Sequence, residues 1–144
     1  MPHLKQVSPN LRRDGPTLEV QIEPVLAAQR VMQVDGDEVI SVPIRVLIDT
    51  GASGTLVQTS VIERLGLDRI GTVLLTTPST TKPLVRYQYR VRIVLSKTIA
   101  FETNAVEGAL IGQDIECLIG RDILEEVVFT YDGPNNRFSI NPKS

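Results

Sequence analysis

The residues best suited to chemistry in this sequence are Asp49, Thr50 and Gly51, which directly follow the apolar run Val46-Leu47-Ile48. This order predicts a buried strand that delivers an acid to the tip of a tight turn. A carboxylate in such a place costs free energy unless it is hydrogen-bonded or used chemically. Taken alone, these residues leave two interpretations of Asp49 open: a cap of its own turn, or a catalytic acid.

The composition removes most alternative catalytic groups. The chain of 144 residues has one histidine, His3, and one cysteine, Cys117. A Ser-His-Asp triad therefore lacks a positioned base, and a histidine or thiolate metal site lacks its ligands. No glycine-rich phosphate-binding motif occurs, so we expect no cofactor and no metal. Carboxylates remain as the candidate catalytic groups, and Cys117 is expected to be an inert thiol in the core.

Length and charge narrow the class of protein further. A chain of 144 residues with 42% hydrophobic residues fits one globular domain with a real core. The formal net charge of −2 gives no electrostatic reason to expect nucleic acid as a partner. No apolar run reaches membrane-spanning length and residues 1–5 lack the apolar stretch of a signal peptide, so we expect no membrane partner and a cytoplasmic location.

Segments with apolar residues at alternating positions surround Asp49 and predict a mainly β protein with one or two short helices. Residues 17–23 form one such segment, and residues 39–48 form a longer one. In the longer segment the residues that share one face are Val42, Ile44, Val46 and Ile48. Further strands are expected at residues 70–75, 84–95, 99–106, 117–119, 127–131 and 137–140.

Residues 1–16 contain Pro2, Pro9 and Pro16 and show little periodicity. We therefore expect a mobile N-terminal leader at 1–16, followed by the domain at 17–144. Within the domain, Asp35-Gly36-Asp37 predicts a turn between two apolar runs, the first of which is Val31–Val34.

Two segments have helical signals. Ser60 and Glu63 have the spacing of a capping box, and Gly66 suits the position just beyond the end of a helix. Residues 122–126 carry acids in their first turn, where a helix dipole favours negative charge. We expect Asp122 to have this structural role at the start of the second helix.

A second notable element, Leu118-Ile119-Gly120-Arg121-Asp122, has the pattern of a buried strand that stops at a glycine. Together with Leu47-Ile48-Asp49-Thr50-Gly51-Ala52, it resembles the paired sequence elements of the retropepsin-like aspartic proteases. The similarity covers about residues 17–141. It implies the retropepsin-like acid protease fold, a single-lobe, closed β-barrel-like domain that is all-β apart from short helices.

The resemblance also implies a catalytic role for Asp49. Aspartic proteases use two carboxylates, which share a proton and activate water for attack on a peptide bond. This chain holds one Asp-Thr-Gly, so the resemblance implies a homodimer that pairs Asp49 of both subunits and cleaves an extended peptide or protein. Thr50, Gly51, Ala52 and Gly120 would support the active-site loop.

The flap of the family would fall on a polar, turn-rich segment here, with Thr77, Pro78, Ser79 and Thr80 as its residues. Ser53 and Gly54 depart from viral members, which often carry an acid after Ala52 that pairs with the arginine at the position of Arg121. This departure leaves the role of Arg121 open. It also leaves a second hypothesis, a retropepsin-fold dimerisation or peptide-binding module with weak or no proteolysis.

Overall fold

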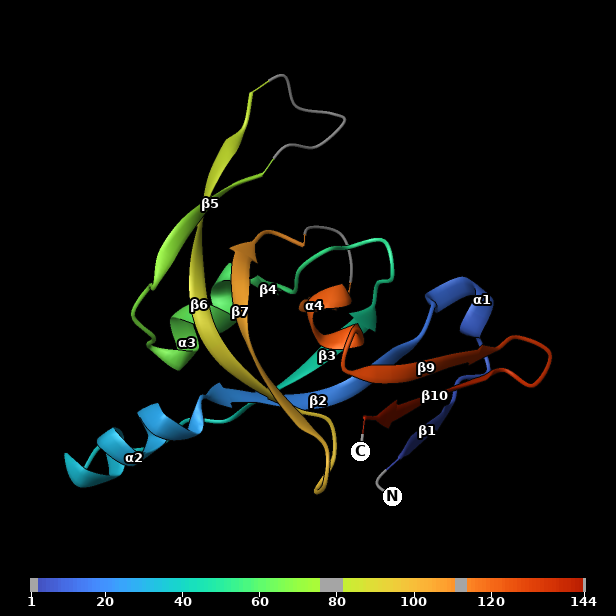
Figure 1. Ribbon diagram of the computed structural model, residues 1–144, viewed down its shortest axis with the longest axis horizontal. Coiled ribbons are helices and arrows are strands. Elements are labelled where there is room, and N and C mark those ends of the chain that lie inside the picture. The colour runs from blue at the N-terminus through green and yellow to red at the C-terminus, as the bar shows by residue number, and fades with distance from the viewer. Residues whose placement is uncertain (1–2, 76–81, 111–113, 144) are drawn as a thin grey trace.

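A closed sheet forms the body of the molecule (Figure 1), and Asp49 directly follows the last residue of one of its strands. The computed structural model describes residues 3–75, 82–110 and 114–143. In this part of the chain one sheet of seven strands has the order β2-β3-β8-β4-β7-β6-β5, and an additional β2–β6 pairing closes it into a barrel. The barrel strands are β2 (Thr17–Pro24), β3 (Val42–Ile48), β4 (Leu56–Gln58), β6 (Leu84–Val94), β7 (Ala100–Gly108) and β8 (Cys117–Ile119). The expected mainly β, single-lobe barrel is confirmed.

Strand β3 shows why this sequence forms a barrel. Its exposed fractions alternate as predicted: Val42, Ile44, Val46 and Ile48 are at most 4% exposed. The strand pairs antiparallel with β2 on one edge and parallel with β8 on the other. Its buried face packs into one apolar core with residues from the other barrel strands, such as Ile22, Val91 and Ile119. The apolar alternation therefore fixes which face of β3 enters the core.

Strand β5 (Gly71–Leu75) pairs with the first half of β6 and forms a hairpin that rises out of the barrel (Figure 1). The register runs from Gly71 opposite Gln88 to Leu75 opposite Leu84. At the base of this hairpin, the guanidinium of Arg69 lies over the Tyr87 ring, 4.3 Å from its centroid. The residues expected to form the flap, Thr77, Pro78, Ser79 and Thr80, lie outside the described residues.

The N-terminal segment is part of the fold, so the expectation of a mobile leader is wrong for residues 4–14. Strand β1 (Leu4–Val7) pairs with β10 (Arg137–Pro142), which also pairs with β9 (Val127–Asp132) in a three-stranded sheet. Helix α1 (Leu11–Asp14) follows, and its Leu11 is 1% exposed within the core. Pairing with the distant strand β10 and burial of Leu11 offset the entropy that a free leader would keep.

Both predicted helices are present, as α3 (Thr59–Leu65) and α4 (Arg121–Leu124). Gly66 ends α3 in the left-handed conformation, at φ 64° and ψ 32°, as its sequence position suggested. The predicted capping box is wrong: the N-cap residue is Gln58, and it makes no side-chain capping bond. None of the helices in the described ranges is long and apolar enough to cross a membrane.

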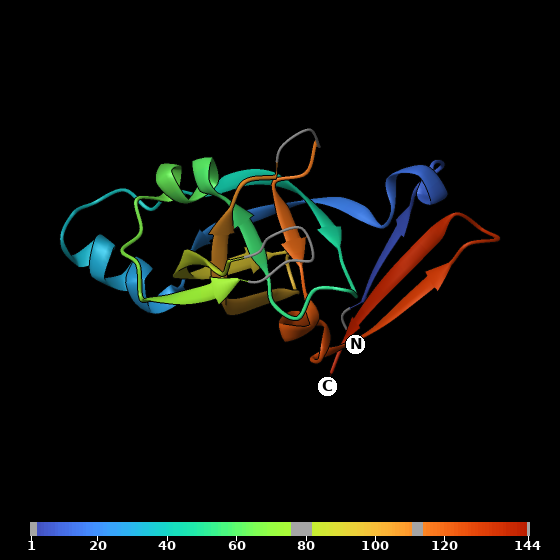
Figure 2. The ribbon, with the colours of Figure 1, turned by 90° about the horizontal axis from the view of Figure 1, so that it is seen from above.

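Helix α2 (Leu26–Val34) was not predicted, because its last four residues, Val31–Val34, look like the first apolar run of a strand pair. The preceding Leu, Ala and Gln residues favour a helix, and this propensity decides the local structure. The helix lies at the opposite end of the molecule from the three-stranded sheet (Figures 1 and 2).

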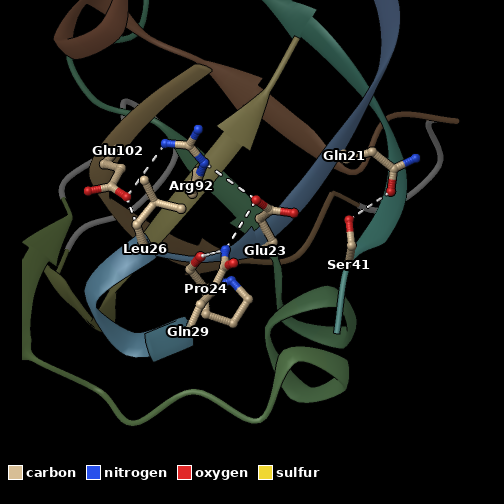
Figure 3. A network of polar contacts seen from close by, with 8 residues as sticks. All are labelled: Gln21, Glu23, Pro24, Leu26, Gln29, Ser41, Arg92 and Glu102. Atoms are coloured by element: carbon tan, nitrogen blue, oxygen red, sulfur yellow. Dashed lines mark hydrogen bonds and ion pairs between the residues drawn. The ribbon is translucent and has the colours of Figure 1, made fainter. Parts of the chain in front are cut away.

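A polar network attaches α2 to the barrel (Figure 3). The backbone N–H of Leu26 donates to Glu102 Oε2 at 2.9 Å, and Gln29 Nε2 donates to the Pro24 carbonyl at 2.7 Å. Arg92 on β6 lies between the carboxylates of Glu23 and Glu102, at 3.4 and 3.7 Å. The network fixes the start of a helix that has no buried residue of its own.

Leu11 tests whether the N-terminal segment belongs to the folded domain. Leu11→Ala removes a buried side chain, and we expect it to lower the free energy of unfolding by about 2–5 kcal/mol. Val7→Ala is the matched control, because Val7 lies in the same segment but is 66% exposed. We expect it to change stability by less than about 1 kcal/mol. Urea unfolding measures both, and a Leu11→Ala protein as stable as the wild type would contradict the structure.

Candidate active site

Asp49 follows the last residue of β3 and is held from both sides of that strand. The N–H of Ile48 donates to the Pro16 carbonyl at 3.0 Å, and the N–H of Asp49 donates to the Ile119 carbonyl at 2.9 Å. Successive strand residues point their backbone groups to opposite edges, so the two bonds hold opposite edges. Asp49 itself is half-buried.

The turn after Asp49 is closed by its own carboxylate. The N–H of Gly51 donates to Asp49 Oδ1 at 2.9 Å, and the N–H of Ala52 donates to the Asp49 carbonyl at 3.1 Å. Asp49 therefore caps its own turn, one of the two interpretations of the sequence. This bond uses one carboxylate oxygen and orients the group, so capping is compatible with catalysis.

The strand that ends at Gly120 lies directly against this loop. A Cβ atom at position 120 would overlap the Gly54 carbonyl and stand 3.0 Å from the Ala52 oxygen. Gly120 is itself buried, and the N–H of Arg121 donates to the Ala52 carbonyl at 2.8 Å. Glycine is the residue that lets two backbones approach so closely.

The Arg121 side chain supports the loop in a way that the sequence did not indicate. Its Nη1 donates to the Thr50 carbonyl at 2.7 Å. The guanidinium therefore binds a backbone oxygen of the Asp-Thr-Gly turn, although Ser53 and Gly54 provide no carboxylate for it. The side chain of Thr50 remains exposed at the surface.

A second carboxylate, that of Asp122, has a supporting position behind the loop. Its Oδ1 accepts from the Thr55 hydroxyl at 2.8 Å and its Oδ2 from the Thr103 hydroxyl at 2.6 Å. The Thr55 oxygen, which is fully buried, also accepts from the N–H of Gly120 at 3.3 Å. Asp122 lies in the first turn of α4, as expected, and its bonds connect α4 with β7 and with Thr55, the residue just before β4.

Cys117 lies on β8 within the core and is fully buried. Burial, with a smaller effect of the Asp122 charge, raises the pKa of its thiol far above the ordinary value. A neutral, enclosed thiol is a poor nucleophile, so the cysteine contributes packing to the barrel.

A cleft of about 1040 Å³ opens beside the Asp49 loop. It runs from the loop, under the β5–β6 hairpin and across β7, to α4. Asp49 itself is not among the residues that line the cleft; the lining residues of the loop begin at Gly51, two positions later. The lining residues from the loop and the hairpin are Gly51, Ala52, Ser53, Gly54, Thr55, Val73, Leu75, Gln88 and Arg90.

The combination of an acid on a glycine-braced turn, a crossing glycine strand and a hairpin over a cleft has a counterpart among known families. The family model described as "Aspartyl protease" matches residues 31–123 of this chain. The chain belongs to the aspartyl protease family. The match spans both the Asp49 loop and the Gly120 crossing, so the retropepsin-like interpretation of the sequence is confirmed.

Three solved structures are similar to this chain, and the first of them shows the same fold. A retropepsin-like aspartic protease from Rickettsia conorii superposes with a TM-score of 0.56 at 19% identity, over 98% of this chain and 91% of that chain. The EIAV protease complexed with the inhibitor HBY-793 is 26% identical and has a TM-score of 0.49, covering 83% of this chain and 92% of that one. The retroviral protease-like domain of Ddi1 from Leishmania major is 17% identical with a TM-score of 0.46, over 89% and 93% of the two chains. A search of the curated proteins found no match.

Two glycines at the crossing provide a matched test of its geometry. Gly120→Ala places a methyl group against the Gly54 carbonyl, so we expect it to lower the free energy of unfolding by about 3 kcal/mol or more. Gly54→Ala lies at the same crossing, but its Cβ would have no neighbour within 4 Å. We expect this control to change stability by less than about 1 kcal/mol. Equal unfolding midpoints for the two variants in urea would contradict the close approach.

Proposed function

We propose that this protein is a homodimeric aspartic endopeptidase in which Asp49 of each subunit forms one half of the catalytic pair. The observation that carries the proposal is the position of Asp49 on a half-exposed, firmly held loop at the edge of a large cleft. An acid needed only to cap a turn would require neither the cleft nor the supports from Ile119 and Arg121. The family membership of the chain agrees with this proposal.

The proposed mechanism follows from the chemistry of paired carboxylates. Two carboxyl groups in contact cannot both ionise at low cost, so they share one proton. The ionised group acts as general base on a water molecule that attacks the peptide carbonyl. The protonated group donates a hydrogen bond to the carbonyl oxygen. When the C–N bond of the tetrahedral intermediate breaks, the leaving amine takes up the proton that the general base removed from water. In this chain the bond from Gly51 to Asp49 Oδ1 orients the carboxylate for these steps.

The dimer is needed because each chain supplies one such carboxylate. Thr50 and Gly51, beside Asp49, are exposed in the single chain, and they are the surface through which two loops would meet. A two-fold axis there would place the same residues of both subunits opposite each other. Each loop would then bring its Thr50 hydroxyl to the interface. The backbone of Thr50 is already held by the bond from Arg121 to its carbonyl.

The cleft suits an extended peptide. Its walls combine apolar side chains, such as Val73 and Leu75, with the backbone of the Asp49 loop. An extended chain presents backbone groups for strand-like hydrogen bonds and alternate side chains for pockets. The β5–β6 hairpin would cover the bound peptide from the side opposite the loop.

Asp49→Asn tests the catalytic role. The amide keeps the shape of the side chain and can still accept the bond from Gly51, so the variant should fold and dimerise like the wild type. We expect kcat/KM on a proteome-derived peptide mixture, assayed between about pH 3 and 8, to fall by about a thousandfold or more. Mass spectrometry of the products gives the cleaved bonds, and sedimentation gives the oligomeric state.

Three outcomes would contradict the proposal in different ways. Equal cleavage by the wild type and Asp49→Asn would remove Asp49 from catalysis. A strictly monomeric protein under cleaving conditions would remove the paired mechanism. A dimeric wild type that cleaves no peptide but retains peptides from the mixture would favour a peptide-binding module.

A further inference from the structure

The N-terminal segment reaches the strand that carries Asp49. Residues 15 and 16 lie beside the end of β3, where the Pro16 carbonyl accepts the bond from the N–H of Ile48. The β2–β3 register continues from this point, with Thr17 opposite Leu47. The residue before Asp49 is therefore held by Pro16, the last residue of the segment that the sequence predicted to be a mobile leader.

A continuous chain of contacts connects this point with the three-stranded sheet. The N–H of Ser8 donates to the Asn136 carbonyl at 2.8 Å, just beyond the pairing of β1 with β10. The N–H of Gly15 donates to the Leu11 carbonyl at 2.8 Å and closes α1. The Leu11 side chain enters the core that also holds Ile48. Residues 4–16 are thus attached at the sheet, in the core and at β3.

Gly15 is shaped to receive a side chain of β3. Its backbone has φ 74° and ψ −177°, a combination that residues with a Cβ rarely adopt. A Cβ atom there would stand 2.9 Å from Leu47 Cδ1, closer than carbon atoms approach without moving. The Leu47 side chain therefore occupies the space that the missing Cβ leaves, two residues before Asp49.

We propose that residues 4–16 are an intramolecular brace for the catalytic strand, in which Gly15 and Leu47 are positioning residues for Asp49. The inference rests on the proposed function and adds a requirement to it: the active protein keeps this segment. The physical reason is that the end of β3 is hydrogen-bonded along both of its edges. Ile48 bonds Pro16 on one edge, and Asp49 bonds Ile119 on the other. Displacing one edge tilts the strand end, and small shifts of a catalytic group cost much rate.

The experiment compares four full-length variants: Gly15→Ala, Leu47→Ala, the double variant Gly15→Ala/Leu47→Ala, and Gly36→Ala. Gly36 is the control because it also has a positive φ, of 77°, but its Cβ would meet nothing within 4 Å. Two readouts are used. Amide hydrogen exchange reports on the Ile48 and Asp49 N–H groups, and steady-state kinetics separates kcat from KM.

We expect Gly15→Ala to speed exchange at Ile48 and Asp49 by about tenfold and to lower kcat by a similar factor, with KM changed by less than about twofold. Leu47→Ala makes room for the new methyl group but leaves the backbone strain of an alanine at φ 74°, so the double variant should regain only the part of the loss that the contact with Leu47 causes. Gly36→Ala should leave both readouts at the wild-type level. Should Gly15→Ala fail to fold, Leu47→Ala alone still tests the brace, because it empties the same contact without straining the backbone.

The brace is overturned if Gly15→Ala leaves the exchange rates at Ile48 and Asp49 unchanged. If Gly15→Ala does not fold, unchanged exchange rates in Leu47→Ala overturn it instead. An equal effect from Gly36→Ala overturns it too. Faster exchange with unchanged kcat shows that the contact is structural only and overturns the positioning role. A wild type without Asp49-dependent cleavage refutes the proposed function, and the positioning role with it. Exchange at Ile48 then still decides whether residues 4–16 hold this strand.

Discussion

The close approach of Gly120 to the segment from Ala52 to Gly54 is the constraint on which the rest of the site depends. Two stretches far apart in the chain meet there with no side chain between them, and the Arg121 N–H bonds the Ala52 carbonyl at 2.8 Å. This contact sets the distance between β3 and the start of α4. It also brings the Arg121 guanidinium within reach of the Thr50 carbonyl. A larger residue at position 120 would separate the two stretches and lose both bonds together.

Hydrogen bonds from short polar side chains then hold this close approach in one geometry. The Thr55 hydroxyl is fully buried, so leaving it unpaired would cost about 1–3 kcal/mol. It accepts from Gly120 and donates to Asp122, whose other oxygen accepts from Thr103. The Asp122 carboxylate thus accepts from two hydroxyl donors, one on β7 and one just before β4. In a region with few polar alternatives, such a network favours one arrangement of these elements over others.

The parts of the fold that depend on local patterns could be predicted from the sequence, and the parts that depend on distant partners could not. Alternation identified the buried face of β3, and an acid-turn-glycine order identified the Asp49 loop. By contrast, the three prolines in residues 1–16 indicate only that this segment by itself does not favour regular structure. The pairing of β1 with β10 depends also on residues near the other end of the chain. Helix α2 was missed because Val31–Val34 has no periodicity that separates a helix from a strand. The partners of Asp122 are Thr103 on β7 and Thr55 just before β4, and neither has a sequence signal of its own.

The supports of the Asp49 loop come from one chain, and this bears on how a dimer would work. The backbone N–H of Ile48 donates to Pro16, and that of Asp49 donates to Ile119. The Thr50 carbonyl accepts from Arg121, and the N–H of Gly51 orients the Asp49 carboxylate. A loop held at successive residues has little conformational entropy left to lose when it meets a second copy. In the proposed dimer, association would therefore bring together two loops that already have their shape. The favourable free energy of the interface would then offset the cost of bringing the two Asp49 carboxylates together. A shared proton lowers this cost because it removes one of the two negative charges. In the proposed dimer, the exposed Thr50 and Gly51 would be the residues of this supported loop that meet the second copy.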